Sequence, residues 1–230
     1  MCKLKSMIVL KDRIYCPDHD SHQQMLEELG IKDDYLGASK TFVRVEVSPD
    51  NDDITIPVDE WQINVDQDIT PDWFDADEYR ERIYETVKAW AAEHIHTSGV
   101  VEEISSGIHF VCGSATIKTV SRSATIEWVG DSATIKRVGG SATIKTVNRS
   151  ATIEWVGESA TIEWVCGSAT IEWVGGSATI VSSNIWSWSN INKVAIGDNA
   201  TIVDRYNKTI YQAGDGWTFV KAEEEVTTTT

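Results

Sequence analysis

The chain of 230 residues has few of the features that mark several large classes of protein, and its basic residues are greatly outnumbered by acidic ones. It carries 20 Lys and Arg against 36 Asp and Glu, a formal net charge of −16. So acidic a chain repels the phosphates of nucleic acids and of anionic lipids, and we expect no direct binding to either. The acidity is greatest in residues 1–98, which hold 10 Lys and Arg and 22 Asp and Glu. It is compatible with a basic protein partner, or with mimicry of nucleic acid that inhibits a DNA-binding enzyme.

Cysteines and long apolar runs are scarce too. The four cysteines lie far apart in the sequence, at positions 2, 16, 112 and 166, which favours reduced thiols over a disulfide framework. No window approaches the roughly 18 apolar residues of a membrane span. No basic stretch followed by an apolar run opens the chain, so we expect no signal peptide. These absences predict a cytoplasmic protein that makes no contact with membranes.

Common catalytic motifs are missing as well. The sequence contains no GxGxxG, no Walker A motif and no GxSxG. These patterns build dinucleotide sites, phosphate sites and nucleophile elbows, respectively. We therefore expect a protein that is not an enzyme.

What the chain has instead is a repeat of nine residues. The phrase SATI begins at Ser114 and returns every nine residues, without a slip, as far as Ser177. In the pattern S-A-T-I-(K/E)-(W/T/R)-V-x-x of the regular units, at residues 114–176, the Ala, Ile and Val never change, whereas the fifth and sixth residues vary. Thr, Ile, Val and Trp favour strands, and the last two positions hold turn residues. We expect Ala, Ile and Val to face inward, the fifth and sixth residues to face outward, and a bend to lie between Ile and Val.

This pattern predicts a parallel β-solenoid in which two units of nine residues make one coil of 18. A coil of three units, with three faces, is the alternative. The calcium-binding β-roll has the same period but needs GGxGxD turns, which are absent, so no calcium is expected. In the coil of two units, the predicted neighbours of opposite charge, or of cation and ring, are Glu127 and Lys145, Asp131 and Arg149, Lys136 and Glu154, and Arg137 and Trp155.

Residues 1–98 form a predicted acidic α+β head domain. We expect a hairpin or one kinked strand over 7–15, a helix over 20–30, a strand over 41–47, one or two strands over 54–68 and a helix over 75–95. The solenoid follows at residues 99–185. Irregular strands at 186–222 would cap it, and residues 223–230 would form a disordered tail.

One short segment of the head, "CPDHDSH", carries ligand chemistry. Cys16, His19 and His22 would offer one sulfur and two nitrogens, and Cys2 or Asp20 a fourth ligand, in the kind of donor set that zinc prefers. The alternative is a capped turn with surface histidines. A zinc-binding head with a hydrolytic or regulatory role is therefore the second function that we consider.

The order of these parts resembles a group of proteins from bacteriophages and gut bacteria. The resemblance lies in "CPDHDSHQQMLEELGIKDDYLGASKTFVRVEV", "VDEWQINVDQDITPDWFD" and "YETVKAWAAEHI", which are followed by tandem nonapeptides. The group's nonapeptides are of the "GNSSVxxMWG" or "GSATVxAYG" kind, whereas this chain has SATI and places Trp sixth. The group has no assigned activity, so the resemblance implies a mobile-element setting and no catalytic residues.

The leading prediction is an interaction or scaffold protein that binds a protein partner or itself. Exposed tryptophans are costly unless they are paired, and clustered tryptophans often mark a binding surface. The alternative is that these rings shield strand edges or pack on the head. The predicted binding surface consists of Trp128, Trp155, Trp164, Trp173 and Arg137.

Overall fold

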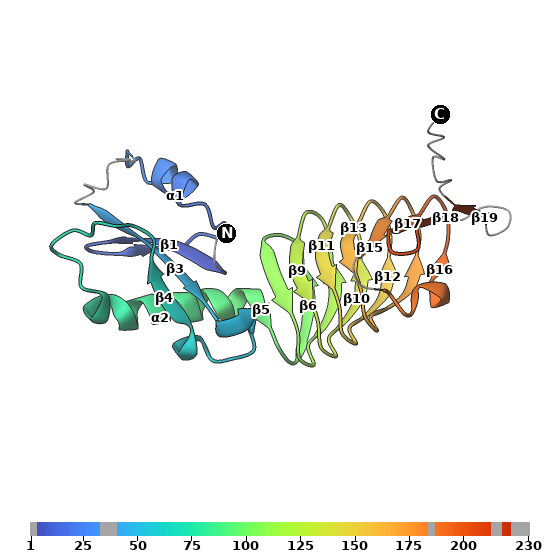
Figure 1. Cartoon of the computed structure of the whole chain (residues 1–230), viewed down its shortest axis with the longest axis horizontal. Helices are drawn as coiled ribbons and strands as arrows, with labels where there is room; N and C mark the ends of the chain where they lie inside the picture. The colour runs from blue at the N-terminus through green and yellow to red at the C-terminus, as the bar shows by residue number, and fades with distance from the viewer. Residues whose placement is uncertain (1–3, 33–40, 184–186, 213–217, 222–230) are drawn as a thin grey trace, which may run out of the picture. The chain divides into compact units, whose positions relative to one another are not determined.

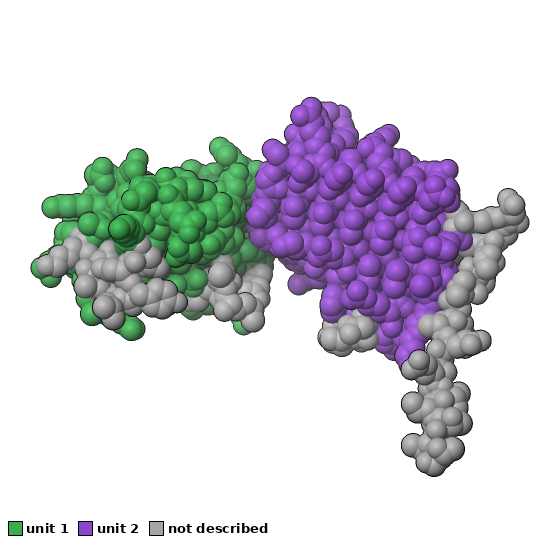
Figure 2. Space-filling model, turned by 90° about the horizontal axis from the view of Figure 1, so that it is seen from above, with its two compact units in different colours: residues 1–95 green, residues 96–230 purple. Residues whose placement is uncertain are grey.

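The computed structural model describes residues 4–32, 41–183, 187–212 and 218–221. Cys2 and the predicted tail at 223–230 lie outside these residues. The chain forms two compact units, Met1–Ile95 and His96–Thr230, which Figure 2 colours separately. In the described part of the chain, no helix has both the length and the apolar character needed to cross a bilayer.

The first unit is an antiparallel sheet of four strands, in the order β2-β1-β3-β4, with α1 on one face and α2 on the other (Figure 1). This arrangement confirms the predicted α+β class. Two short 3-10 turns, η1 (Asp50–Asp52) and η2 (Val58–Glu60), connect β3 to β4. The strands and helices are β1 (Lys5–Leu10), β2 (Ile14–Tyr15), α1 (His22–Glu28), β3 (Phe42–Ser48), β4 (Gln62–Val65) and α2 (Ala76–His94).

Both faces of the central strands are apolar because a helix covers each of them. Ile8 and Phe42 pack with Met25 and Leu26 of α1 on one face. On the other face, the valines of β3 and Met7 and Val9 of β1 pack with Tyr79, Ile83 and Val87 of α2.

Each helix of the head begins at the polar residue that caps it. The Ser21 hydroxyl accepts a hydrogen bond from the Gln24 backbone N–H, and the Asp75 carboxylate accepts from those of Asp77 and Glu78. These caps satisfy donors that the first turn of a helix leaves unpaired. Both helices therefore begin within two residues of the predicted positions.

The second unit is a parallel β-solenoid with two sheets (Figure 1). Residues two repeat units apart are in register, such as Thr134 with Thr152 and Ile135 with Ile153. The solenoid prediction and its coil of two units are therefore confirmed, and the coil of three units is wrong. The strands of one sheet are β6 (Val100–Ile104), β8 (Thr116–Val120), β10 (Thr134–Val138), β12 (Thr152–Val156), β14 (Thr170–Val174) and β16 (Ala195–Ile196).

The other sheet contains the intervening strands and the last hairpin of the chain. Its strands are β5 (Ile95–His96), β7 (Ile108–Val111), β9 (Thr125–Val129), β11 (Thr143–Val147), β13 (Thr161–Val165), β15 (Thr179–Ser182), β17 (Thr201–Asp204), β18 (Thr209–Gln212) and β19 (Thr218–Lys221).

The unchanging residues of the repeat form the solenoid core, as predicted. Every Ala, Ile and Val from Ala115 to Val174 that occupies one of these three positions is at most 1% exposed. Full burial of one Ile or Val side chain contributes about 1.5–3 kcal/mol, so each coil adds a similar stabilising layer. Register pairs join the third, fourth, sixth and seventh residues of stacked units in β10 and β12, and leave out the fifth. This interruption at the fifth residue lets both Ile and Val face inward although they lie three apart.

Beyond residue 185, β16 and β17 extend the two parallel sheets. The coil lengthens here, because Thr179 is in register with Thr201 and no longer with the position two repeat units later. The added residues include η3 (Ile191–Lys193) and the buried Trp188, whose indole N–H donates to the Ala169 carbonyl at 2.8 Å. The antiparallel strand β18 then pairs with β17, and β19 pairs with β18.

Candidate functional site

The predicted binding surface occupies the sixth position of the repeat, and its residues lie on both faces of the solenoid. Trp155, Trp173 and Arg137 are on the sheet that contains β12, whereas Trp128 and Trp164 are on the sheet that contains β13. Arg137 is exposed, but the four tryptophans are only half-exposed. The contacts that cover each ring therefore decide which of them is available to a partner.

Arg137, Trp155 and Trp173 form one continuous stack along the solenoid. The Arg137 guanidinium lies 4.0 Å from the centre of the Trp155 ring. The Trp155 and Trp173 ring centres are 5.3 Å apart, with an angle of 11° between the planes. Both contacts join residues of successive coils, as the two-unit coil predicts. Each ring already has a stacking partner, which reduces the surface it can offer to another molecule.

The predicted ion pairs between coils are present in two of three cases. The Lys145 amine lies 2.6 Å from the Glu127 carboxylate, and the Arg149 guanidinium 2.8 Å from that of Asp131. The predicted pair of Lys136 with Glu154 does not form among the residues that the structure describes. A ladder position shared by two coils therefore allows an ion pair without requiring it.

Glycine at the eighth position explains how three of the tryptophans are half-buried. A Cβ atom added at Gly157 would lie 2.0 Å from the Trp155 ring, and one at Gly175 would lie 1.9 Å from the Trp173 ring. The same holds for Gly130 and Trp128, at 2.3 Å. Each ring lies against the backbone of the glycine two residues later. This relation was missed from the sequence, although W-V-G is readable there as a recurring triplet.

Trp128 has two further contacts. Its indole N–H donates to the Asn148 side-chain oxygen at 2.9 Å. The Arg149 guanidinium lies 5.6 Å from its ring centre. Trp128 is thus fastened to the next coil, where Asn148 occupies the eighth position of its repeat unit.

Trp164 differs because its unit has Cys166 where the other tryptophan units have glycine. The Trp164 side chain makes a hydrogen bond to the Cys166 thiol. Burial raises the pKa of this thiol, and the hydrogen bond acts in the opposite direction. Trp164 also lines a pocket of about 420 Å³, here called the Trp164 pocket. The pocket is lined by Lys145, Thr146, Thr161, Glu163, Trp164, Val181 and Arg205.

The ninth position is a left-handed turn in every regular unit, whether or not it is glycine. Its φ is +53° at Arg122, +64° at Gly140 and +57° at Glu158. The Glu158 carboxylate accepts a hydrogen bond from the Gly140 N–H at 2.6 Å. Asp131 accepts from Gly113 in the same way, at 3.1 Å. These turns fasten neighbouring coils, and the repeat pattern alone did not predict that role.

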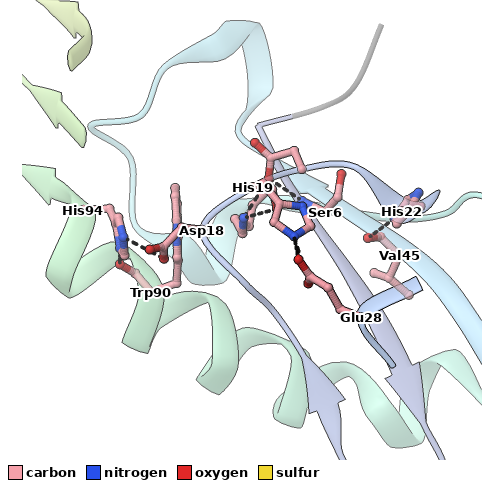
Figure 3. A network of polar contacts seen from close by, with 10 residues as sticks. Ser6, Asp18, His19, His22, Glu28, Val45, Trp90 and His94 are labelled. Atoms are coloured by element: carbon pink, nitrogen blue, oxygen red, sulfur yellow. Dashed lines mark hydrogen bonds and ion pairs between the residues drawn. The ribbon is translucent and has the colours of Figure 1, made fainter. Parts of the chain in front are cut away.

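In the head, the three candidate zinc ligands, Cys16, His19 and His22, each contact different groups. The His19 Nε2 atom lies 3.1 Å from the Glu28 carboxylate, whereas His22 faces the Val45 carbonyl (Figure 3). Burial raises the pKa of the Cys16 thiol from an ordinary value of 9.0 to about 11. The Glu28 pKa is lowered, chiefly by its hydrogen bond with His19.

A different set of ligand atoms converges in the head. Donor atoms of His22, Glu46 and Asp66 all lie within 4.8 Å of one another. The set includes His22 but neither Cys16 nor His19. Its members come from α1, β3 and the residue after β4, so no short sequence pattern contains them.

Two other ionisable side chains of the head have structural partners. The fully buried Lys5 amine lies 2.7 Å from the Asp20 carboxylate and 5.0 Å from the centre of the Trp90 ring. His94 stacks on Trp90 and lies 3.1 Å from Asp18 (Figure 3). These contacts account for both groups as parts of the fold.

Comparisons with protein-family models, with curated proteins and with solved structures gave no match to this chain. The functional argument therefore depends on the residues and their geometry alone.

Proposed function

We propose that the chain is a non-enzymatic interaction protein whose solenoid binds a protein partner at the Trp164 pocket. The observation that carries this proposal is the exception at Cys166. In the other three tryptophan units the ring lies against a glycine, where an added Cβ atom would be 1.9–2.3 Å from the ring. Cys166 has a Cβ atom at that place, so the Trp164 ring is kept off the backbone and lines the pocket.

The pocket has the composition of a site that receives one anchoring side chain. An aromatic wall supplies apolar area, and Lys145, Glu163 and Arg205 supply charge at the rim. A volume of about 420 Å³ is sufficient for one or two side chains. Lys145 is already paired with Glu127, so one acidic and one basic lining residue, Glu163 and Arg205, remain to contact polar groups beside the anchor.

The proposed setting is the cytoplasm. Cys16, Cys112 and Cys166 are free thiols. The partly exposed Cys166, at the edge of a proposed contact surface, is better suited to a reducing compartment.

The experiment that tests the function compares three forms of the whole chain as bait in lysate of the source organism. Cys166→Gly gives its unit the sequence of residues 168–176, so Trp164 can lie against the backbone and narrow the pocket. Trp164→Thr removes the ring and keeps a residue that the repeat already uses at this position. We expect one captured protein to be lost with both variants. Sedimentation of the purified forms separates this result from self-association.

A matched control is Trp155→Thr, which removes a tryptophan from the opposite sheet. We expect it to retain the partner. Equal capture by all forms would place the contact outside the pocket and contradict the proposal. Loss with Trp155→Thr alone would assign binding to the Arg137–Trp155–Trp173 stack instead.

A further inference from the structure

Three segments that are distant in the sequence bring a histidine and two carboxylates together in the head. His22 is the first residue of α1, Glu46 lies in β3 and Asp66 directly follows β4. One ligand atom from each lies within 4.8 Å of the other two. Glu46 is on the face of the sheet that α1 covers, because its neighbour in register on β1 is Ser6, two residues from the buried Ile8.

The two nitrogens of His22 face different groups. Nε2 lies 3.3 Å from the Val45 carbonyl oxygen, an acceptor that requires a proton on this nitrogen. Nδ1 lies 3.3 Å from Asp66 Oδ2. In the neutral ring with Nε2 protonated, the Nδ1 lone pair points at a carboxylate, which is repulsive unless a proton or a metal ion lies between them. Metal-bound histidines commonly donate their second N–H to a backbone carbonyl in this way.

Among the three ligands, Glu46 is the one whose burial is least usual for a carboxylate. It is only 9% exposed, and no donor or cation contacts its carboxylate in the described ranges. Burying most of a carboxylate without a cation beside it is unfavourable in general. The Ser6 hydroxyl, directly across in β1, is also buried and has no hydrogen-bond partner among the described residues. Two unpaired polar groups beside a histidine and a second carboxylate indicate a site made for a cation.

We propose that His22, Glu46 and Asp66 bind a divalent transition-metal ion, with zinc as the probe. Bonds of about 2.0–2.1 Å to nitrogen and oxygen in a tetrahedral site place ligand atoms about 3.3 Å apart, close to the spacing of His22 Nδ1 and Asp66 Oδ2. The half-exposed Asp66 leaves a side of the site open to water, as in zinc sites with three protein ligands. A carboxylate pair with one imidazole suits zinc or manganese better than a thiolate-binding ion.

The main competing cation is a side chain on the same face of the sheet. Arg44 lies two residues before Glu46, and its guanidinium carbon is 5.0 Å from the centre of the Phe42 ring. Phe42 lies on the side of Arg44 away from Glu46 along β3. The arginine is therefore directed away from the Glu46 carboxylate, which stays available to an ion.

The test is a zinc titration of the whole chain after removal of metal with EDTA, in competition with a chromogenic chelator. We expect one Zn²⁺ per chain. Glu46→Gln and Asp66→Asn keep the shape of each side chain and remove its charge, and each is expected to weaken binding at least tenfold. Zinc should also raise the unfolding temperature of the wild type but not that of Glu46→Gln, because only bound metal stabilises the fold by mass action.

His19→Asn is the matched control, since His19 pairs with Glu28 at 3.1 Å and does not belong to the converging set. We expect it to bind zinc as the wild type does. Absence of stoichiometric binding in the wild type would overturn the proposal. So would binding that survives Glu46→Gln and Asp66→Asn, and loss with His19→Asn or Cys16→Ser would assign the metal to the CPDHDSH segment instead. None of these outcomes depends on the Trp164 pocket.

Discussion

The packing of Trp155 on Gly157 gives a prediction that can be tested against a control substitution in another unit of the same repeat. Replacing Gly157 with alanine adds a Cβ atom 2.0 Å from the Trp155 ring, so the ring must leave its place. The ring then loses its stacking with Trp173 at 5.3 Å and its contact with the Arg137 guanidinium at 4.0 Å. The φ of Gly157 is not in the left-handed region, so alanine is acceptable to the backbone itself.

The expected loss in the free energy of unfolding follows from the two contacts that the Trp155 ring gives up. A stacked aromatic pair contributes about 0.5–1.5 kcal/mol. A cation–π contact at an exposed site contributes about 0.5–1 kcal/mol, and the Arg137 side chain is 53% exposed. We therefore expect Gly157→Ala to lower the free energy of unfolding by about 1–2.5 kcal/mol. The circular-dichroism exciton signal of the stacked Trp155 and Trp173 indoles should weaken in the same variant.

The matched control lies one coil earlier. Gly139 has the same place in its unit, but Arg137 occupies the sixth position there. A Cβ atom at Gly139 would lie 3.1 Å from the end of the Glu158 side chain, which also contacts the Gly140 N–H and the Arg137 guanidinium. We expect Gly139→Ala to cost up to about 1 kcal/mol, less than Gly157→Ala, because these contacts have to shift slightly but no ring leaves its place.

Urea unfolding of the two variants, and of Gly157→Ala combined with Trp155→Thr, completes the assay. The alanine should be nearly neutral once the ring is absent, which gives a coupling energy of about 1 kcal/mol or more. Equal costs at Gly139 and Gly157, or a coupling energy near zero, would refute the packing argument.

Two further predictions concern the turns and the head. Arg122→Gly should stabilise the solenoid by up to about 1 kcal/mol in thermal unfolding, because it relieves a left-handed residue. Gly140→Ala, one coil later, should destabilise it, since its Cβ atom would lie 2.5 Å from the Arg122 backbone nitrogen; the same sign for both would contradict this reasoning. Burial raises the pKa of Cys16 to about 11, so the folded head disfavours the thiolate and loses about 2–3 kcal/mol as the pH rises from 9 to 11. Cys16→Ala should lack this alkaline loss, and a wild type with the same pH profile would show that the thiol ionises freely.

The solenoid was predictable because every coil repeats the same contacts. Ala, Ile and Val kept their places through the repeat, so inward residues could be separated from outward ones without knowledge of the rest of the fold. The same reasoning placed Arg137 beside Trp155 and Lys145 beside Glu127. It failed for Lys136 and Glu154, because adjacent positions in a ladder permit an ion pair but do not require one.

The Trp164 pocket was only partly predictable. The repeat shows Cys166 at the position where the other three tryptophan units have glycine, but the consequence for the ring two residues earlier depends on a distance that no pattern contains. The triplet W-V-G was a signal that could have indicated it.

The sequence by itself determined the architecture: a head with helices that begin near residues 20 and 75, followed by coils of two repeat units each. These features follow from local propensity, capping and a strict period, which act between residues close in the chain or related by the repeat. Only the tertiary structure decided which polar groups of the head meet. It paired His19 with Glu28 and brought His22 to Glu46 and Asp66, since a non-repeating sheet and its helix join segments whose spacing in the sequence carries no record of their contact.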